Sequence, residues 1–331
     1  MKAIWLIQLG TPDAPTRAAT KKYLDQFLMD PRMIELPYLF RSLLVKGVIT
    51  PFRSGKSAKA YASVWMKDGS PLMVHSKNLA TALQEELGDE YRVVLGMRYG
   101  SPSIESSWNI LRKFNLDQIQ VVPLFPQYSS ATSASVYDEI YRVLSKEVSV
   151  PALEFLPPFF NQKGFIDSFA AVAREHLTEE FDHYLFSFHG LPEKLVRRAD
   201  QNCLKIKNCC ERDGREINFC YRAQCYHSAR GIQKALNLPS EKVSVAFQSR
   251  LAGAKWLDPY TDQEILKMPQ KGIKRLAVFC PSFVADCLET LEEIGDRARE
   301  DFLGAEGQEL KLIPSLNSHP IWVQTLASWL R

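Results

Sequence analysis

Eight short apolar runs are the feature that most constrains the fold of this 331-residue chain. Each run has the length of a strand, and segments with helical periodicity separate the runs. The expected strands cover residues 3–9, 92–98, 118–125, 153–157, 184–188, 243–249, 275–280 and 309–314. The expected helices include residues 76–87, 104–114, 137–144, 162–176 and 286–302. Continuous apolar strands that alternate with helices are typical of parallel sheets covered on both faces, so we expect an α/β protein.

The length of the chain favours two domains, because 331 residues exceed what a single hydrophobic core usually supports. A break near residues 149–151 divides the chain into similar halves. We therefore expect one domain over residues 1–150 and a second over residues 151–331, with a C-terminal helix that can pack back on the first. Ligands of such folds bind beyond the carboxyl ends of the strands, so residues directly after each strand are the first candidates for a site.

Charge and composition exclude several classes of function. The net charge of +3, from 41 basic and 38 acidic residues, is too weak to indicate nucleic-acid binding. The first strand is not followed by G-x-G-x-x-G, and the sequence contains no Walker A motif. The opening "MKAIWLIQLGTPDAP" is typical of a first strand and not of a signal peptide, and no run is long enough to cross a bilayer. We expect a cytoplasmic protein whose thiols are reduced unless they bind metal.

His189 directly follows the expected strand at 184–188, in the sequence "SFHGLPEK". A histidine at this position can be a general base, a metal ligand or a buried structural residue. The neighbouring Gly190 and Pro192 indicate a shaped loop, which favours a functional role.

A row of acidic residues lies in the expected helix after the strand at 275–280. Spacing of i, i+3, i+7, i+10 and i+14 places them within an arc of roughly 80° on one helical face. One interpretation is a solvated acidic face, and the other is a line of oxygen ligands that leads a divalent cation into a pocket. The five residues are Asp286, Glu289, Glu293, Asp296 and Glu300.

The stretch over residues 35–65 interleaves large apolar side chains with basic ones. It is either a helix of the core or a lip that covers a large apolar ligand and rests on a membrane surface. Contact with a membrane would involve residues 36–49.

Five of the seven cysteines lie in a single window, "NCLKIKNCCERDGREINFCYRAQC", within an expected insertion at residues 200–225. The spacing lacks the paired C-x2-C knuckles of a zinc ribbon, and a cytosolic location disfavours disulfides. Four of these thiolates could bind either a [2Fe–2S] cluster or Zn²⁺. The expected ligands are Cys203, Cys210, Cys220 and Cys225, with Cys209 as the alternative to Cys210.

Nine segments, in the same order along nearly the whole chain, resemble the ferrochelatase family. A single such segment would be weak evidence, whereas nine in order are strong evidence. The segments are "LIQLGTPDAPT", "YLDQFLMDPRMIELP", "GSPLMVHSKNLATAL", "LGMRYGSPSIESSWNIL", "PLFPQYSSATSAS", "SFHGLPEK", "FQSRLAGAKWLDPYT", "PSFVADCLETLEEI" and "SLNSHPIW".

The resemblance implies two Rossmann-like domains, each a four-stranded parallel sheet flanked by helices, with a porphyrin cleft between them. It implies insertion of Fe²⁺, the metal substrate, into protoporphyrin IX. His189 would contact the pyrrole centre, Glu289 would be its acidic partner, and Glu293 would continue the acidic line. The same three residues would bind the metal substrate. The residues that would line the porphyrin site are Leu9, Arg98, Tyr99, Phe125, Tyr128, Ser129 and Trp256.

The chain departs from this family pattern at several positions. Cys287 stands where some relatives carry a second histidine, and Leu9 stands where relatives carry Met or Tyr, a position linked to the choice of porphyrin. Some ferrochelatases carry a [2Fe–2S] cluster with ligands near the C-terminus. This C-terminal region has no cysteine, and Ser130 occupies the place of an upstream ligand. An internal cluster in the cysteine window would replace that arrangement.

Three alternatives remain open from the sequence. The first is a ferrochelatase that acts on coproporphyrin III, although the apolar lip and Leu9 favour the less polar protoporphyrin IX. The second is a non-catalytic carrier of a tetrapyrrole or haem. The third is an iron–sulfur redox protein in which the cysteine window is the active centre. Both a monomer and a homodimer fit the sequence, and no nucleic acid is expected as a partner.

Overall fold

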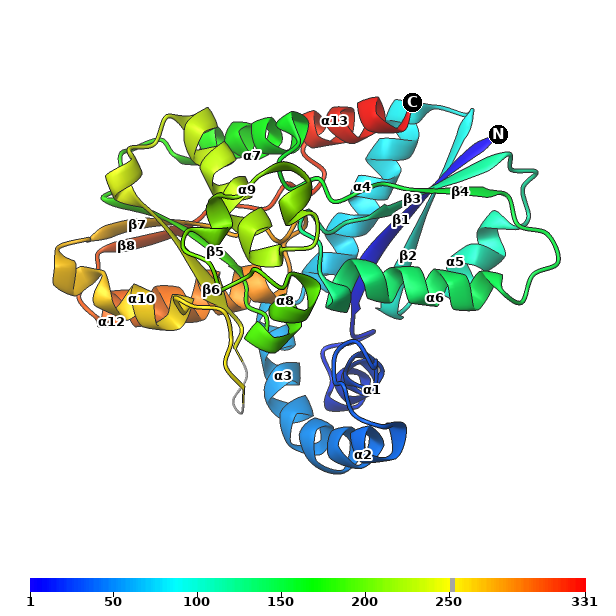
Figure 1. Ribbon diagram of the computed structural model, residues 1–331, viewed down its shortest axis with the longest axis horizontal. Coiled ribbons are helices and arrows are strands. Elements are labelled where there is room, and N and C mark those ends of the chain that lie inside the picture. Colours follow the sequence, from blue (N-terminus) through cyan, green and yellow to red (C-terminus); the bar gives the residue numbers. More distant parts are fainter. Residues whose placement is uncertain (251–253) are drawn as a thin grey trace. The chain divides into compact units, whose positions relative to one another are not determined.

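The computed structural model describes residues 1–250 and 254–331, and these residues contain two four-stranded parallel sheets (Figure 1). The strand order is β2-β1-β3-β4 in the first sheet and β6-β5-β7-β8 in the second. The strands are β1 (Lys2–Thr11), β2 (Tyr91–Gly100), β3 (Gln118–Pro123), β4 (Ala152–Phe155), β5 (His183–His189), β6 (Val243–Gln248), β7 (Arg275–Phe279) and β8 (Glu309–Leu312). The predicted fold class and all eight predicted strands are confirmed, with every strand end within two residues of its expected position.

The helices fill the segments between the strands, as the alternation predicts. Helices α4 and α5 begin after a serine whose hydroxyl accepts a backbone N–H, Ser70 and Ser103 respectively. The α-helices are α1 (Arg17–Leu28), α2 (Tyr38–Ser42), α3 (Thr50–Val64), α4 (Pro71–Leu87), α5 (Ile104–Leu111), α6 (Ser135–Leu144), α7 (Lys163–His176), α8 (Glu193–Ala199), α9 (Tyr221–Leu236), α10 (Thr261–Lys267), α11 (Leu288–Thr290), α12 (Arg299–Gly304) and α13 (Pro320–Leu330). Two π-helical segments, η1 (Leu43–Ile49) and η7 (Leu291–Ala298), continue α2 and α11.

The chain divides into two compact units, each built around one sheet. Unit 1 comprises residues 1–124, 130–157 and 326–331, and unit 2 comprises residues 125–129 and 158–325. Strand β4 pairs with β3, so the first sheet extends past the expected boundary at residue 150. The short segment 125–129, which directly follows the extended part of β3, belongs to unit 2.

In unit 1 the central strand β1 carries five consecutive side chains, residues 3–7, that are fully buried. Helix α4 packs on β1 and β2, and α5 packs on β2 and α6. The carboxyl ends of β1 and β2 approach each other closely at Gly10. A Cβ atom there would lie 1.8 Å from the Tyr99 carbonyl oxygen, and φ is +119°, so this position requires glycine.

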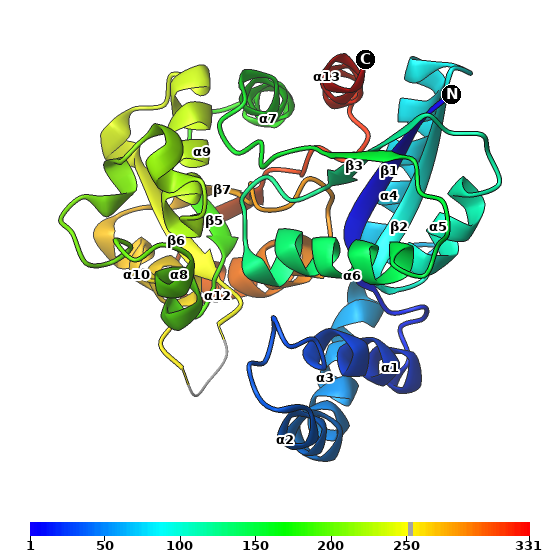
Figure 2. The same cartoon turned by 45° about the vertical axis from the view of Figure 1, so that its right-hand side comes forward.

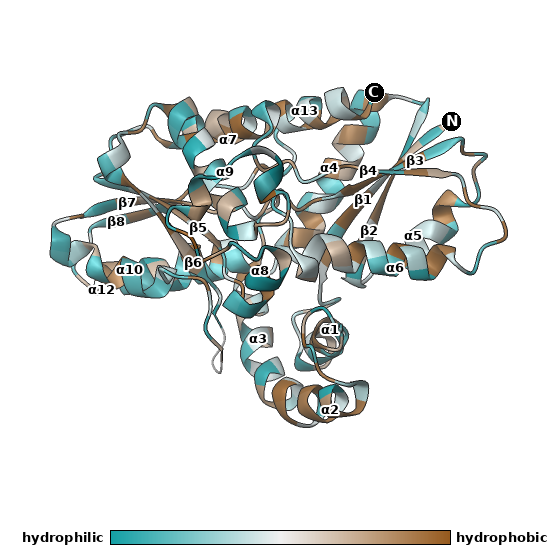
Figure 3. Ribbon diagram, in the orientation of Figure 1, coloured by the Kyte–Doolittle hydropathy of each residue, from teal (hydrophilic) through white to brown (hydrophobic). Residues whose placement is uncertain are grey.

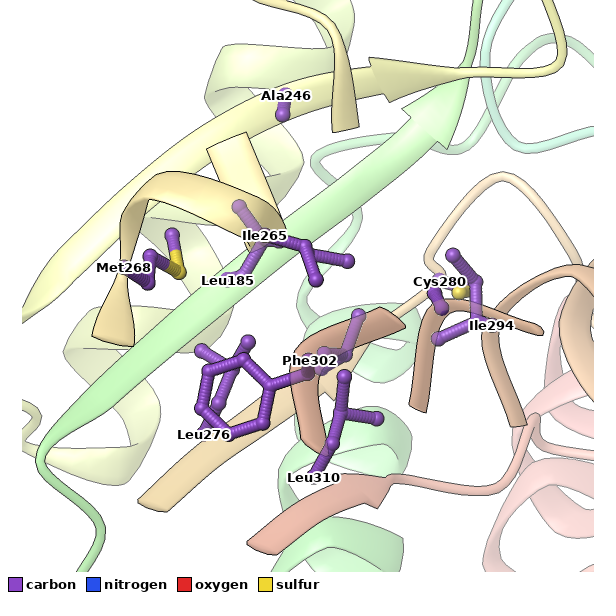
Figure 4. Close-up of a cluster of buried hydrophobic side chains, with 11 residues drawn as sticks. Leu185, Ala246, Ile265, Met268, Leu276, Cys280, Ile294, Phe302 and Leu310 are labelled. Atoms are coloured by element: carbon purple, nitrogen blue, oxygen red, sulfur yellow. The ribbon is translucent and has the colours of Figure 1, made fainter. Parts of the chain in front are cut away.

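In unit 2 the sheet lies between two helical layers. Figures 1 and 2 show α7 and α9 side by side over one face, whereas α10 and α12 cover the other. The second layer encloses an apolar cluster in which Phe302 of α12 packs with Leu185, Leu276 and Leu310 from three strands (Figure 4). This core supports the sheet whose carboxyl edge carries His189.

The acidic segment after β7 differs from the predicted continuous helix over residues 286–302. Helix begins only at Leu288, and π-helical hydrogen bonding replaces the α-helical pattern over Leu291–Ala298. Asp286 lies before the helix, because its carboxylate accepts hydrogen bonds from the Ser315 N–H, the Thr290 hydroxyl and the Asn317 amide. The expected single face of five acids is therefore wrong: Asp286 is buried and bonded, and Asp296 and Glu300 are exposed.

Candidate active site

His189 is the last residue of β5, and the hydrogen bonds around it specify its tautomer. The ring Nδ1 lies 2.6 Å from the carbonyl oxygen of Gly190. A carbonyl oxygen can only accept a hydrogen bond, so Nδ1 carries the proton in the neutral ring. The other ring nitrogen, Nε2, is then unprotonated and available to accept a proton. The ring also lies 6.3 Å from the Phe283 ring, in an edge-on arrangement.

The loop after His189 is held against β6. The Gly190 N–H donates to the carbonyl oxygen of Gln248 at 2.8 Å, and a Cβ atom on Gly190 would lie 2.7 Å from that oxygen. The same Cβ position is 3.3 Å from the Trp256 ring, which is buried. Trp256 therefore lies directly beside the residue that follows His189. Its indole Nε1 is buried and has no hydrogen-bond partner among residues 1–250 and 254–331.

Gln248 connects the end of β6 with the acidic segment. Its side-chain Nε2 donates to the Glu289 carbonyl oxygen at 2.7 Å and lies 3.4 Å from Glu293 Oε2. The Ser249 N–H and hydroxyl donate to the two carboxylate oxygens of Glu293, at 2.9 Å and 2.5 Å. Because His189 is the register partner of Gln248 in the sheet, these contacts bring His189, Glu289 and Glu293 to the same carboxyl edge. Sequence reasoning missed Gln248, although it lies in the "FQSR" segment.

Residues 125–129 contribute further predicted site residues to unit 2. The Tyr128 N–H donates to Gln224 of α9 at 2.7 Å, and the Tyr128 ring contacts Phe219 at 5.1 Å. Phe125 and Ser129 are buried. The short segment is thus tied to the N-terminal half of α9, which contains the end of the cysteine window.

Unit 1 holds the remaining predicted porphyrin contacts, Leu9, Arg98 and Tyr99, at the carboxyl ends of β1 and β2. Arg98 and Tyr99 both donate to Asp30 Oδ2, at 2.5 Å and 2.8 Å, and the Ser135 hydroxyl donates to the same oxygen at 2.5 Å. Burial alone would raise the pKa of Asp30. The hydrogen bonds from Ser135, the Arg32 N–H and Tyr99, together with the charge of Arg98, outweigh burial and lower that pKa.

The five thiols of the cysteine window are all buried and free. The Cys209 and Cys210 sulfurs lie 3.9 Å apart. A hydrogen bond with Cys203 and burial raise the pKa of Cys220, and burial raises the pKa of Cys225. The Arg222 guanidinium donates to Cys210 at 2.9 Å.

This donor chemistry fits a tetrathiolate site, because clustered thiols beside a cation favour thiolate ligands. Burial raises the pKa of Cys210 to about 12, so the unliganded thiol is protonated at neutral pH. Across residues 1–250 and 254–331, no three Cys, His, Asp or Glu side chains are already arranged to hold a metal ion. Ligation therefore requires the thiols to turn toward a common point and release protons.

Two four-stranded parallel sheets flanked by helices are a fold that this chain shares with solved structures of chelatases. The solved structures of SirB from Bacillus subtilis agree with this class. The form with Fe³⁺ has a TM-score of 0.53 and 12% identity over 100% of this chain and 94% of that one. The cobalt complex from subspecies spizizenii has a TM-score of 0.55 and 11% identity over 99% and 92%.

Within this class, the chain belongs to the ferrochelatase family. The ferrochelatase family model matches residues 1–331. The ferrochelatase of Coxiella burnetii strain RSA 493 is 48% identical over 98% of this chain and 91% of its own length. The ferrochelatase of Azotobacter vinelandii is 45% identical over 99% and 98%. The protein is accordingly an enzyme of the metal chelatase class that inserts metal into a porphyrin for haem synthesis.

Proposed function

We propose that the protein inserts Fe²⁺ into protoporphyrin IX, with His189 as the proton acceptor and Glu289 and Glu293 as oxygen ligands that deliver the ion. The observation that supports this assignment most directly is the contact network of Gln248. It connects the strand end beside His189 with the backbone of Glu289 and the carboxylate of Glu293. The base and the acids thus share one edge of one sheet.

The chemistry requires removal of both pyrrole N–H protons and of the water around the ion. With Nδ1–H donated to Gly190, the Nε2 lone pair of His189 is free to accept a pyrrole proton. Carboxylates along one segment can replace the waters of Fe²⁺ one at a time, which avoids a single large desolvation step. Apolar and aromatic walls, such as Trp256, suit the flat macrocycle.

We favour protoporphyrin IX over coproporphyrin III as the substrate, because the latter carries more carboxylates and the lip is strongly apolar. Along the lip, residues 35–65, many large side chains face solvent, and Figure 3 colours α2 as hydrophobic. The exposed residues are Leu36, Tyr38, Leu39, Phe40, Leu43, Leu44, Val48 and Phe52. Leu9 is the second apolar feature that favours this choice.

The same lip supports a peripheral contact with a membrane surface. None of the helices in the described part of the chain has the length and apolar character that a membrane span requires. Isolated surface apolar residues are common, but a contiguous apolar patch of this kind indicates an interaction site. Lys46, Lys56 and Lys59 lie within the lip and can contact anionic headgroups.

We further propose that the cysteine window binds a [2Fe–2S] cluster through Cys203, Cys210, Cys220 and Cys225, with Zn²⁺ as the alternative metal. Cys209 is the alternative ligand to Cys210. When bound, such a group would link the segment after α8 to the start of α9 and supply folding energy, and a cluster would add sensitivity to oxidation. In this proposal the cysteine window has a structural or oxidation-sensing role, and the metalation reaction takes place elsewhere.

An anaerobic metalation assay with Fe²⁺ and each porphyrin tests the proposal. His189→Ala should lower the rate by about 10²-fold or more, the range for loss of a proton acceptor, while porphyrin binding stays measurable by fluorescence quenching. His183→Ala is the matched control, because His183 lies at the opposite end of β5 and bonds Ser244.

Near wild-type turnover of His189→Ala would refute the assigned role of His189. Faster turnover of coproporphyrin III would overturn the substrate choice. Single-turnover mixing that shows no acceleration over solution would instead favour a tetrapyrrole carrier.

A further inference from the structure

Both backbone polar groups of His189 are held by side chains from other elements. The His189 N–H donates to the Ser282 hydroxyl at 3.3 Å, and the His189 carbonyl accepts from the Tyr221 hydroxyl at 2.8 Å. Ser282 follows β7, and Tyr221 is the first residue of α9. The two hydroxyl oxygens lie 3.1 Å apart.

The directions of these hydrogen bonds follow from the donor inventory of each group. The hydroxyl of Tyr221 has one hydrogen, and the His189 carbonyl can only accept, so Tyr221 donates to it. Ser282 accepts from the His189 N–H and is left to donate its own hydrogen to the Tyr221 oxygen. The three residues therefore form a closed ring in which every donor has an acceptor.

This ring touches the cysteine window directly. Tyr221 follows Cys220 in the chain and lies one helical turn before Cys225, and all three residues are buried. Residues four positions apart lie on the same face of a helix, so Tyr221 and Cys225 are neighbours on α9. A change in the position of Cys220 or Cys225 must therefore move Tyr221 or strain the helix between them.

We propose that Tyr221 is a positioning residue that couples the cysteine window to His189. Tyr221 holds the His189 carbonyl and so restrains the peptide that joins His189 to Gly190. The carbonyl oxygen of Gly190 in turn accepts the hydrogen bond from His189 Nδ1. The positions of the thiols thereby affect how strongly the structure favours the His189 tautomer with the proton on Nδ1 and none on Nε2. The relevance of this coupling to turnover rests on the proposed role of His189.

Tyr221→Phe tests the positioning role, because it keeps the buried ring and removes only the hydroxyl. We expect kcat to fall by about three- to tenfold, the effect of one lost hydrogen bond, with KM for porphyrin unchanged. The independent readout is the ¹⁵N spectrum of the imidazoles, with the His189 signals identified by their loss in His189→Gln. Wild-type His189 should show Nδ1–H only, and Tyr221→Phe should show a mixture of tautomers.

Tyr184→Phe is the matched control, since Tyr184 lies on the same strand and its hydroxyl accepts a long, 3.5 Å hydrogen bond from the Phe181 N–H. It should change neither kcat nor the His189 signals. If Tyr221→Phe also leaves both unchanged, the inference is overturned. If the His189 signals change but kcat does not, the positioning role holds and the proposed function of His189 fails.

The coupling to the thiols is tested by Cys225→Ser in two backgrounds. We expect this change to shift the His189 signals when Tyr221 is present and to have little further effect in Tyr221→Phe. Equal shifts in the two backgrounds would show that Tyr221 does not carry the coupling. If Cys225→Ser does not fold, Zn²⁺-loaded and chelator-treated protein are compared instead, and unchanged His189 signals in the wild type would overturn the coupling.

Discussion

Asp30 illustrates, at the scale of single residues, how a carboxylate with no obvious signal in the sequence organises its surroundings. Its side chain is almost fully buried and pairs with Arg98, whose side chain is 15% exposed. Tyr99 and Ser135 complete the group from positions far away in the chain. This group holds Arg98 and Tyr99 in place, so their predicted contact with a porphyrin would use the edges that Asp30 leaves open.

Asp30→Asn should reduce the free energy of unfolding by about 3 kcal/mol at pH 7, because it removes the carboxylate 2.5 Å from the Arg98 guanidinium and leaves Arg98 the longer, 3.9 Å pair with Glu139. The folded state lowers the pKa of Asp30 below its ordinary value of 3.8. The stabilisation is therefore present above pH 3.8 and is lost as the pH falls through the lower folded pKa. Denaturation curves of both proteins at pH 7 and pH 3 should show a difference that shrinks at the acid end.

Asp138→Asn is the control, since Asp138 pairs with Arg32 at the surface and should change stability by at most about 1 kcal/mol. A difference between Asp30→Asn and the wild type that is the same at both pH values would contradict the assigned role of the Asp30 charge.

At the scale of elements, the structure distinguishes the two interpretations of the lip, a buried core helix and an exposed apolar surface. Helix α2, the π-helical segment η1 and the start of α3 leave most of their large apolar side chains in solvent; Leu39 is 73% exposed and Phe52 is 83% exposed. Val45 is fully buried, so one side of the segment is anchored in unit 1. The interpretation as a wholly buried core helix is therefore wrong.

Replacing Leu39 and Phe52 together by Ser should weaken binding to vesicles of mixed neutral and anionic lipid by about tenfold or more. Each side chain contributes about 1.5–3 kcal/mol when it moves from water into an apolar environment. The melting temperature should stay the same, because neither side chain is in the core. Cosedimentation measures the binding, and Val148→Ser, which changes an exposed residue outside the lip, should bind like the wild type. Unchanged binding of the double variant would rule out the lip as the membrane contact.

At the scale of the whole molecule, the cysteine window determines how the segment between α8 and α9 is stabilised. Along residues 200–220 the structure has only short 3₁₀ turns, at Cys209–Glu211 and Gly214–Ile217, and the buried thiols provide much of its interior. An ion pair between Arg212 and Asp200 also ties the segment together. Such a segment gains stability when metal joins its thiols.

Cys220→Ser should lower both the bound metal content and the melting temperature of the purified protein, because one ligand and its share of the folding energy are lost. Elemental analysis and the absorption spectrum measure the metal, and thermal unfolding measures the stability. Cys280→Ser serves as the control: it changes a buried cysteine outside the window and should retain the metal. Loss of activity in Cys220→Ser without loss of stability would favour the redox alternative.

The sequence by itself determined the positions of the strands along the chain, the class of the fold and the family. A strand that is buried on both faces needs a continuous run of apolar residues, and such a run can be recognised from the local sequence alone. The same local reasoning found His189, because a residue directly after a buried strand lies at the carboxyl edge wherever that strand is placed. It also identified the cysteine window, because five of the seven cysteines lie in one short segment.

Only the tertiary structure decided which polar groups meet. Gln248 reaches Glu289 and Glu293 across 41 and 45 positions of sequence, and Tyr221 reaches His189 across 32. Asp286 lies outside the predicted helix, because Ser315 and Asn317, 29 and 31 positions away, donate hydrogen bonds to its carboxylate. Side-chain hydrogen bonds depend on distance in space and carry no periodic signal along the chain, so the contacts that tune the site emerge only when the strands are brought together.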